Sequence, residues 1–201
     1  MNISHWLYPV QVLGPGNRIA LWVQGCSRRC QGCISPELQD DNGTLYYVNV
    51  LSEIINKIIT SEHLSGITIS GGEPFDQGNE LLDLCSRLST KDILVYTGYT
   101  YQELSTKYRD SLTTSNIGVL ITNPYIEELN DNLPLRGSSN QEIIYLLPEV
   151  KKKYAEYLRT AKRDQQLFVE PNTVYIAGIP LKGNANIIRT EINNILAERG
   201  E

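Results

Sequence analysis

The stretch IALWVQGCSRRCQGC, residues 19–33, decides how this chain folds and what it holds. Its first part, residues 19–24, is an apolar, β-branched run that predicts a buried strand. Cys26, Cys30 and Cys33 follow directly, so a rigid strand delivers three thiols to one loop. Cysteines packed this closely are typical of a metal site in a reducing compartment rather than of a disulfide framework.

The spacing Cys-x3-Cys-x2-Cys allows one loop to wrap an iron–sulfur cube. A cube of this kind has four irons, so three cysteine ligands leave one iron open to a substrate or a cofactor. Ferredoxins that only relay electrons usually fill all four positions with cysteine. The missing fourth ligand therefore indicates chemistry at the cluster.

A structural zinc site is the alternative, in which His5, His63 or Cys85 would complete a tetrahedral ligand set. Cys85 lies in LLDLCSRL at a helical spacing shared with neighbouring leucines, which favours a buried thiol. His5 and His63 have no acid or nucleophile close to them in sequence, so structural or surface roles are the simpler interpretation.

Apolar runs that end in turn residues alternate with segments of helical spacing through the first 147 residues. This alternation predicts an α/β fold with a mostly parallel sheet. The predicted strands cover residues 19–24, 66–70, 92–97, 117–122 and 142–147, and the predicted helices cover residues 50–62, 79–89 and 100–110.

A C-terminal extension, residues 148–201, follows this core. Pro148 opens a segment of helix formers and mixed charge, which predicts an exposed helix with a solvated basic face. Residues 167–170 and 173–179 read as two short strands separated by Pro-Asn, which predicts a β-hairpin. Residues 184–199 predict a last helix.

The composition limits the class of protein. A chain of 201 residues with 41% hydrophobic content predicts a single domain, with a core at about residues 10–147. A net charge of −5 gives no basic field, so we expect no nucleic-acid partner. The first residues lack a signal peptide's pattern, and no apolar run approaches the roughly 20 residues of a membrane span. We therefore expect a cytoplasmic protein without a membrane partner.

The cysteine spacing is the hallmark of the radical-SAM superfamily, and the surrounding residues narrow the resemblance. Five blocks in a fixed order resemble the anaerobic ribonucleotide reductase activating protein family, over roughly residues 10–145. The blocks are GPGNR at 14–18, LWVQGCSRRCQGCISPE at 21–37, GITISGGEPFDQ at 66–77, YTGYTYQEL at 96–104 and LRGSSNQ at 135–141.

The resemblance implies an activity, its cofactors and its partners. In this family a 4Fe–4S cluster on three cysteines reductively cleaves S-adenosylmethionine to a 5′-deoxyadenosyl radical. That radical generates a glycyl radical on an anaerobic ribonucleotide reductase, and a flavodoxin- or ferredoxin-type protein donates the electron. The fold implied is the open, partial (β/α) barrel of radical-SAM enzymes. Cys26, Cys30 and Cys33 match the cluster ligands.

Gly71, Gly72, Glu73 and Pro74 match the family's motif for the methionine amino group. Glycines let backbone carbonyls approach a ligand, and a carboxylate complements an ammonium group. The simpler interpretation of this tetrapeptide is a tight turn before the helix at 79–89.

Other cofactor-binding candidates lie after later predicted strands, at the edge where parallel sheets usually hold ligands. Thr97, Gly98 and Tyr99 would border the adenosyl group. Asn123 would hydrogen-bond the ribose hydroxyls, although Asn-Pro is also an ordinary start of a turn.

The block LRGSSNQ supplies the remaining candidates. Arg136, Ser138 and Asn140 would provide a guanidinium fork and hydroxyl or amide donors, unless the block is only a polar loop. Arg28 and Arg29 lie inside the cysteine loop, where their charge would offset the thiolates, meet an electron donor or simply face solvent.

Three departures from the family pattern bear on the target of the radical. They are Leu13, Ile34 and the segment ITNPY at 121–125. Two alternatives to activation of a reductase stay open. One is radical-SAM modification of a peptide or small molecule, and the other is a non-catalytic iron–sulfur or zinc module.

Overall fold

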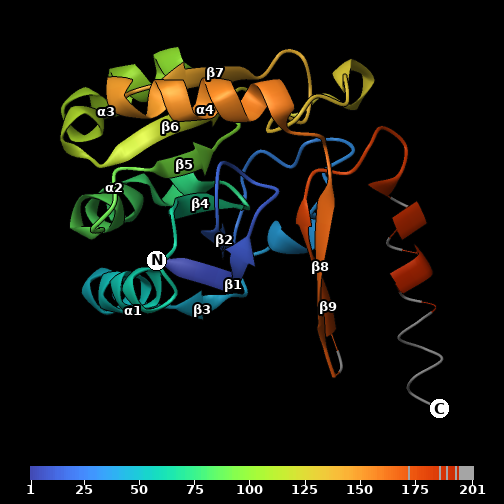
Figure 1. The fold of residues 1–201 in the computed structure, drawn as a ribbon, viewed down its shortest axis with the longest axis horizontal. Coiled ribbons are helices and arrows are strands. Elements are labelled where there is room, and N and C mark those ends of the chain that lie inside the picture. The colour runs from blue at the N-terminus through green and yellow to red at the C-terminus, as the bar shows by residue number, and fades with distance from the viewer. Residues whose placement is uncertain (172, 186, 189, 193, 195–201) are drawn as a thin grey trace.

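The computed structural model describes residues 1–171, 173–185, 187–188, 190–192 and 194. A seven-stranded sheet with strand order β3-β1-β2-β4-β5-β6-β7 forms its centre (Figure 1). The strands are β1 (Asn2–Val10), β2 (Arg18–Val23), β3 (Thr44–Leu45), β4 (Gly66–Gly71), β5 (Ile93–Tyr96), β6 (Ile117–Thr122) and β7 (Glu142–Tyr145).

The four central strands β2, β4, β5 and β6 run parallel, as the alternating pattern predicts. The predicted strand at residues 142–147 is present as β7, and it runs antiparallel to β6 within the mostly parallel sheet. The segment between them holds only the short turn η3 (Glu127–Leu129) in place of a crossover helix, and the chain returns along the same edge. β1 and β3, which sequence analysis missed, add antiparallel strands at the other edge.

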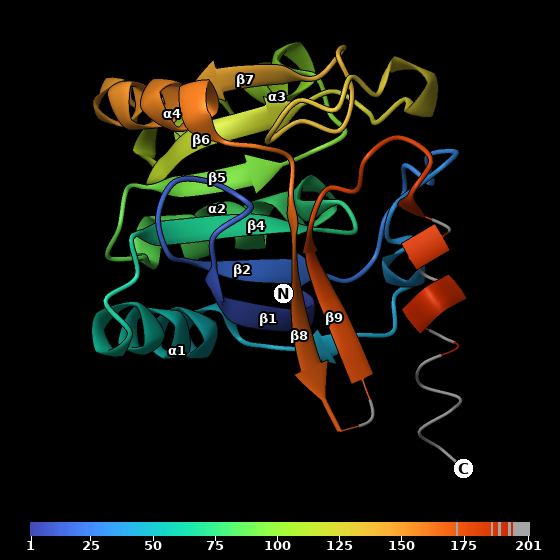
Figure 2. The same ribbon diagram turned by 45° about the vertical axis from the view of Figure 1, so that its right-hand side comes forward.

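Three helices cover one face of the sheet (Figure 2). They are α1 (Val48–Ser61), α2 (Gly78–Arg87) and α3 (Tyr101–Thr114), which confirms the predicted helices with small shifts at the ends. Alternate residues of the strands, such as Ile19 and Leu21, point to this face and join the main core cluster. α3 begins where it does because Thr100 and Glu103 form a reciprocal capping box.

The C-terminal extension covers the other face. The hairpin of β8 (Gln165–Glu170) and β9 (Thr173–Gly178) confirms the prediction, and it packs Phe168 and Tyr175 against Ala20 and Trp22 of β2. α4 (Pro148–Thr160) begins at its predicted proline.

Contrary to the expectation of an exposed helix, α4 also buries two side chains. Val150 and Tyr154 pack on Leu94 and Val119 of the central strands. The helix therefore contributes to the core through one face and exposes the other to solvent.

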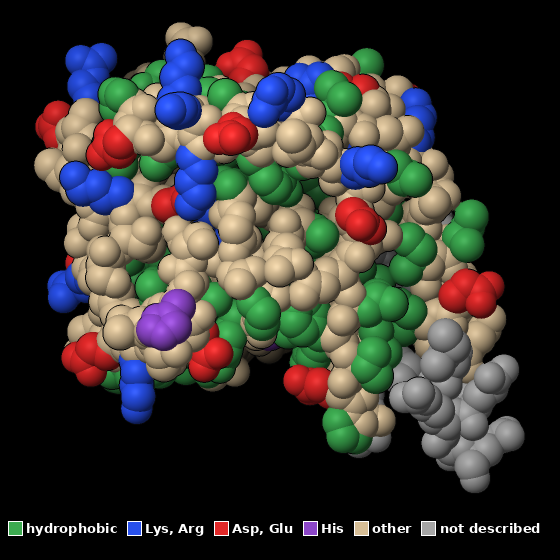
Figure 3. Space-filling view, in the orientation of Figure 1, with side chains coloured by type: hydrophobic (Ala, Val, Ile, Leu, Met, Phe, Trp, Pro, Cys, Tyr) green, Lys and Arg blue, Asp and Glu red, His purple; other side chains and the backbone are tan. Residues whose placement is uncertain are grey.

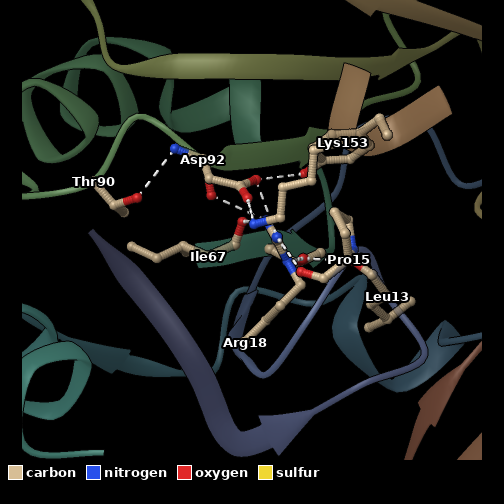
Figure 4. Close-up of polar contacts among 9 residues, drawn as sticks. Leu13, Pro15, Arg18, Ile67, Thr90, Asp92 and Lys153 are labelled. Carbon is tan, nitrogen blue, oxygen red and sulfur yellow. Dashed lines mark hydrogen bonds and ion pairs between the residues drawn. The ribbon is translucent and has the colours of Figure 1, made fainter. Parts of the chain in front are cut away.

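A buried ion pair lies at the amino-terminal end of the parallel strands, far along β2 from the cysteine loop (Figure 4). The Arg18 side chain is 0% exposed, and each of its guanidinium nitrogens donates to an oxygen of Pro15, Ile67, Thr68 or Asp92. Asp92 also accepts from Lys153 and from the Tyr154 hydroxyl of α4. The block GPGNR thus provides a clamp between the sheet and α4.

Within the described residues, β3 and β7 are the two edge strands of the sheet and do not pair with each other, so the sheet is open. The fold is therefore mixed α/β with a parallel centre. No helix in the described part of the chain has the length and apolar character needed to cross a membrane. The helix predicted at residues 184–199 lies partly outside the described residues, although those described between 185 and 194 are helical.

Candidate functional site

The cysteine loop leaves the carboxyl end of β2 and is held by backbone hydrogen bonds. The N–H groups of Gly25 and Cys26 donate to the carbonyls of Leu38 and Gln39, which flank the end of the short turn η1 (Pro36–Leu38). The N–H of Cys33 donates to the carbonyl of Cys30 and closes a turn inside the loop. The loop is thus anchored at its start and folded on itself at its end.

Asp76, which sequence analysis missed, braces the loop from the turn η2 (Pro74–Gln77). Its carboxylate accepts from the backbone N–H of Ser27 at 2.7 Å and from the Ser27 hydroxyl at 2.9 Å. It also accepts from the Tyr99 hydroxyl at 2.9 Å. One carboxylate therefore ties together the loops that follow β2, β4 and β5.

The two arginines of the loop behave differently. The Arg28 guanidinium lies 3.8 Å from the centre of the Tyr99 ring and pairs with Glu103 at 3.6 Å. Arg29 pairs with Asp40 at an exposed position. Arg28 therefore links the cysteine loop to the start of α3, while Arg29 faces solvent.

All three cysteines of the loop line one cavity of about 130 Å³. None of them forms a disulfide. Burial raises the pKa of the Cys26 and Cys30 thiols, while backbone N–H groups near Cys26 and the N–H of Tyr125 near Cys30 act against this rise. Free thiols that share a cavity with backbone N–H donors suit an iron–sulfur cluster, whose sulfurs accept such hydrogen bonds.

Among the described residues, no three Cys, His, Asp or Glu side chains lie close enough together to hold a single metal ion. Tetrahedral zinc needs its ligands to converge on one point, whereas the cysteines of a cube each bind a different iron. The zinc alternative therefore gains no support from the geometry.

The other candidate zinc ligands lie in structural surroundings. Cys85 is fully buried in the main core, and burial raises the pKa of its thiol. His5 stacks on Trp22 and lies beside Tyr175, and burial lowers the pKa of His5 to about 4. His63 occupies an exposed turn after α1 with a positive φ of 50°.

Gly71 and Gly72 are required by close chain packing. Gly71 has a φ of 110°, and a Cβ there would collide with the backbone of Val23 in β2. A Cβ on Gly72 would collide with the carbonyl of Gly25, at the root of the cysteine loop. The glycines thus bring β4 against the cysteine loop, a role different from the close approach to a ligand that sequence analysis expects of them.

Glu73 is 2% exposed and is among the residues that line the cysteine cavity. It accepts from the N–H of Phe75, the hydroxyl of Thr97 and the N–H of Gly98, at 2.7 to 2.9 Å. Burial raises the pKa of Glu73 to about 7, against the effect of these three donors. The carboxylate therefore joins the loop after β4 to the loop after β5, and Pro74 begins η2 beside it.

The structure brings Thr97, Gly98 and Asn123 into the lining of the same cavity, whereas Tyr99 braces its outer side through Asp76. Asn123 adopts a positive φ of 78°, and its side-chain amide donates to the carbonyl of Asn140 at 2.8 Å. These residues come from the carboxyl ends of neighbouring parallel strands, as the topology requires.

Arg136, Ser138 and Asn140 are not among the described residues that line the cysteine cavity. Arg136 pairs with Asp131 at 2.5 Å, and the Ser138 hydroxyl accepts from the N–H of Ile126. Asn140 donates to the carbonyl of Pro124. The structure therefore places these three in the loop before β7, where their contacts hold residues 124–140 together.

Gln141 and Tyr125, which sequence analysis did not select, do line the cavity. The Gln141 side chain accepts from the N–H of Gly137 and donates to the carbonyl of Asn123, so it connects two segments of the loop before β7. The only sequence signal for this role is the last letter of the block LRGSSNQ.

Comparison with known proteins matches the part of the chain that contains this site. Residues 12–144 match the family model described as a 4Fe-4S single cluster domain. The chain is 34% identical over 152 residues to the anaerobic ribonucleoside-triphosphate reductase-activating protein of Escherichia coli (strain K12), a match that covers 71% of this chain and 97% of that protein. It is 32% identical over 145 residues to the protein of the same name from Enterobacteria phage T4, covering 68% of this chain and 90% of the relative.

Proposed function

Because the chain belongs to the anaerobic ribonucleoside-triphosphate reductase-activating protein family, with its 4Fe-4S single cluster domain, we propose that it generates a glycyl radical on such a reductase. Cys26, Cys30 and Cys33 hold the 4Fe–4S cluster in this proposal, and S-adenosylmethionine is the second cofactor. The partial barrel of radical-SAM enzymes is part of the same proposal, and the open sheet with its parallel centre supports it. A flavodoxin- or ferredoxin-type protein supplies the electron.

One observation carries the proposal. Three free thiols from a single loop meet in one cavity with Gly71–Glu73 and Thr97–Gly98, which end two adjacent parallel strands. A cluster held there with one iron free of protein sulfur has polar backbone on the side where a second ligand would bind. A cluster that only relays electrons does not need a binding site for a second ligand beside it.

When bound, the cluster would supply the one electron that cleaves the C5′–S bond of S-adenosylmethionine, so that methionine and 5′-deoxyadenosine would be released and a glycyl radical would be left on the target. The protein's own residues position the reactants. Glu73 fixes the two loops that would receive the methionine and adenosyl groups, while Asp76 holds the cysteine loop beside them.

The test starts from anaerobic reconstitution with iron and sulfide, followed by chemical reduction and addition of S-adenosylmethionine. We expect 5′-deoxyadenosine by chromatography and, once the anaerobic reductase of the same organism is added, a glycyl doublet by electron paramagnetic resonance. Cys30→Ala should lose both products. Cys85→Ala is the matched control, because it removes a buried thiol outside the cavity and should keep both.

Absence of 5′-deoxyadenosine from a preparation with four irons per chain would exclude the proposed chemistry. Formation of 5′-deoxyadenosine without a glycyl signal would instead move the target from the reductase to another substrate.

A further inference from the structure

A second, larger cavity of about 540 Å³ adjoins the cysteine site. The two cavities share part of their lining, including Cys33, Tyr96, Tyr125 and Gln141. The two cavities are therefore neighbours that meet at these residues. The size is within the range of ordinary ligand pockets.

The larger cavity is apolar and poor in charge. Glu37 and Glu127 are the acidic residues among its described lining, and no described Lys or Arg lines it. Val174, Tyr175 and Ile176 of β9 form one wall. Apolar lining with few charged groups is what the centre of a protein–protein interface shows.

The hairpin extends this apolar surface outward. Leu167 pairs with Ile176 and Val169 pairs with Val174 in the β8–β9 register, so these four side chains share one face. Leu167 and Val169 are each 59% exposed. Figure 3 shows hydrophobic side chains gathered over the hairpin. The opposite face of the hairpin packs on β2 and is not available.

Exposed apolar side chains continue around the mouth of the cavity. Ile126 and Leu129 of the η3 region and Leu181 after β9 are all exposed. The two segments touch, because Lys182 donates to the carbonyl of Glu128 and its N–H donates to Asn132. Together with the hairpin face they form an apolar rim. Large exposed apolar patches mark interaction sites on soluble proteins.

The rim is built largely from sequence outside the family match. The family model ends at residue 144, and the match to the Escherichia coli relative covers nearly all of that protein but only 71% of this chain. The hairpin wall is therefore an addition beyond the shared core. A wall added at the mouth of the site points to a function in recognising what enters it.

We propose that the larger cavity and its rim, defined by Leu167, Val169, Val174, Ile176 and Leu181, are the docking surface for an uncharged, apolar segment of the anaerobic reductase. This proposal rests on the proposed function, because a reductase must bring its glycine to the cysteine site. The position of the larger cavity selects this occupant, since Cys33 lines both cavities and a segment bound along the hairpin would lie next to the cysteine site.

The test uses full-length protein carrying Leu167→Ser and Val169→Ser together. Loss of two large apolar contacts should weaken binding to the reductase of the same organism by about 100-fold in a fluorescence titration. Formation of 5′-deoxyadenosine without reductase should stay unchanged, which also shows that the variant folds. The control carries Tyr47→Ser and Val50→Ser, which are 84% and 42% exposed at the start of α1, on the other side of the sheet, and it should bind as the unaltered protein does.

Equal affinity of the hairpin variant and the unaltered protein for the reductase would overturn the proposal. So would self-association of the unaltered protein that the hairpin variant loses, since a second copy would then cover the rim. The proposed function fails separately: if the unaltered protein binds the reductase through the rim but forms no 5′-deoxyadenosine, docking stands and the chemistry does not.

Discussion

Replacing Asp92 by asparagine tests the buried clamp at the end of the sheet opposite the cysteine loop. The change keeps the size of the side chain but leaves the fully buried Arg18 guanidinium without its counter-charge. Removing one partner of a buried ion pair typically costs about 3–5 kcal/mol, and we expect the lower end because the amide oxygen can still accept from Arg18.

For a chain of this size, each kcal/mol moves the unfolding midpoint by about 2–4 °C, so Asp92→Asn should lower it by roughly 6–12 °C. Lys153→Met is the matched control, because Lys153 contacts the same carboxylate but is 42% exposed. Loss of an exposed ion pair is worth at most about 1 kcal/mol. Circular dichroism during heating, on protein without cluster, measures both shifts.

The same clamp predicts a dependence on pH. Burial alone would raise the pKa of Asp92, but Arg18, Lys153 and Tyr154 together bring it below its ordinary value of 3.8. A carboxyl group with a depressed folded pKa contributes stability that is present above its unfolded pKa and is lost as the pH falls through the folded pKa. The difference between the unaltered protein and Asp92→Asn should therefore shrink below about pH 4.

The reasoning is refuted if Asp92→Asn lowers the midpoint no more than Lys153→Met does. It is also refuted if the difference between Asp92→Asn and the unaltered protein is the same at neutral pH and in acid.

Two further predictions concern the site and its surroundings. Asp76→Ala removes the acceptor that braces the cysteine loop, so the reconstituted cluster should lose iron to a chelator about tenfold faster. Asp83→Ala is the control, because it breaks only an exposed ion pair on α2 and should not change the rate of iron loss. His5 has an ordinary pKa of 6.5 and a folded pKa of about 4, so its contribution to stability is present above pH 6.5 and is lost as the pH falls towards 4. Denaturant titrations should show that the free energy of unfolding falls by about 2 kcal/mol between about pH 7 and pH 5, and that His5→Phe largely abolishes this fall. An equal fall in both proteins would contradict the lowered pKa of His5.

The regular elements of the core were predictable because their signals are local. Runs such as residues 117–122 are apolar over a strand's length, and segments such as residues 50–62 repeat apolar residues at helical spacing. The strand at residues 2–10 was not predicted, because Asn2, Ser4 and His5 interrupt its apolar pattern. Its pairing with β2 and β3 depends on long-range contacts that no short window records.

The candidate site divides in the same way. The cysteines and Glu73 were predictable because their spacing and neighbours lie within one short segment each, and the structure brings them into one cavity. Arg136 pairs with Asp131, and Gln141 takes a place in the cavity that its sequence context did not indicate. Which side of a polar loop faces a cavity depends on how distant segments pack, and that information is spread over the whole chain.

The sequence by itself determined the three-thiol loop, the alternation of strands and helices and the hairpin of the extension, because each follows from the order and spacing of neighbouring residues. Only the tertiary structure decided that β7 runs antiparallel and that Gly72 serves the packing of the cysteine loop. It alone decided that the hairpin lines a cavity next to the site. These features depend on the approach of segments far apart in the chain, where steric fit and burial set the arrangement.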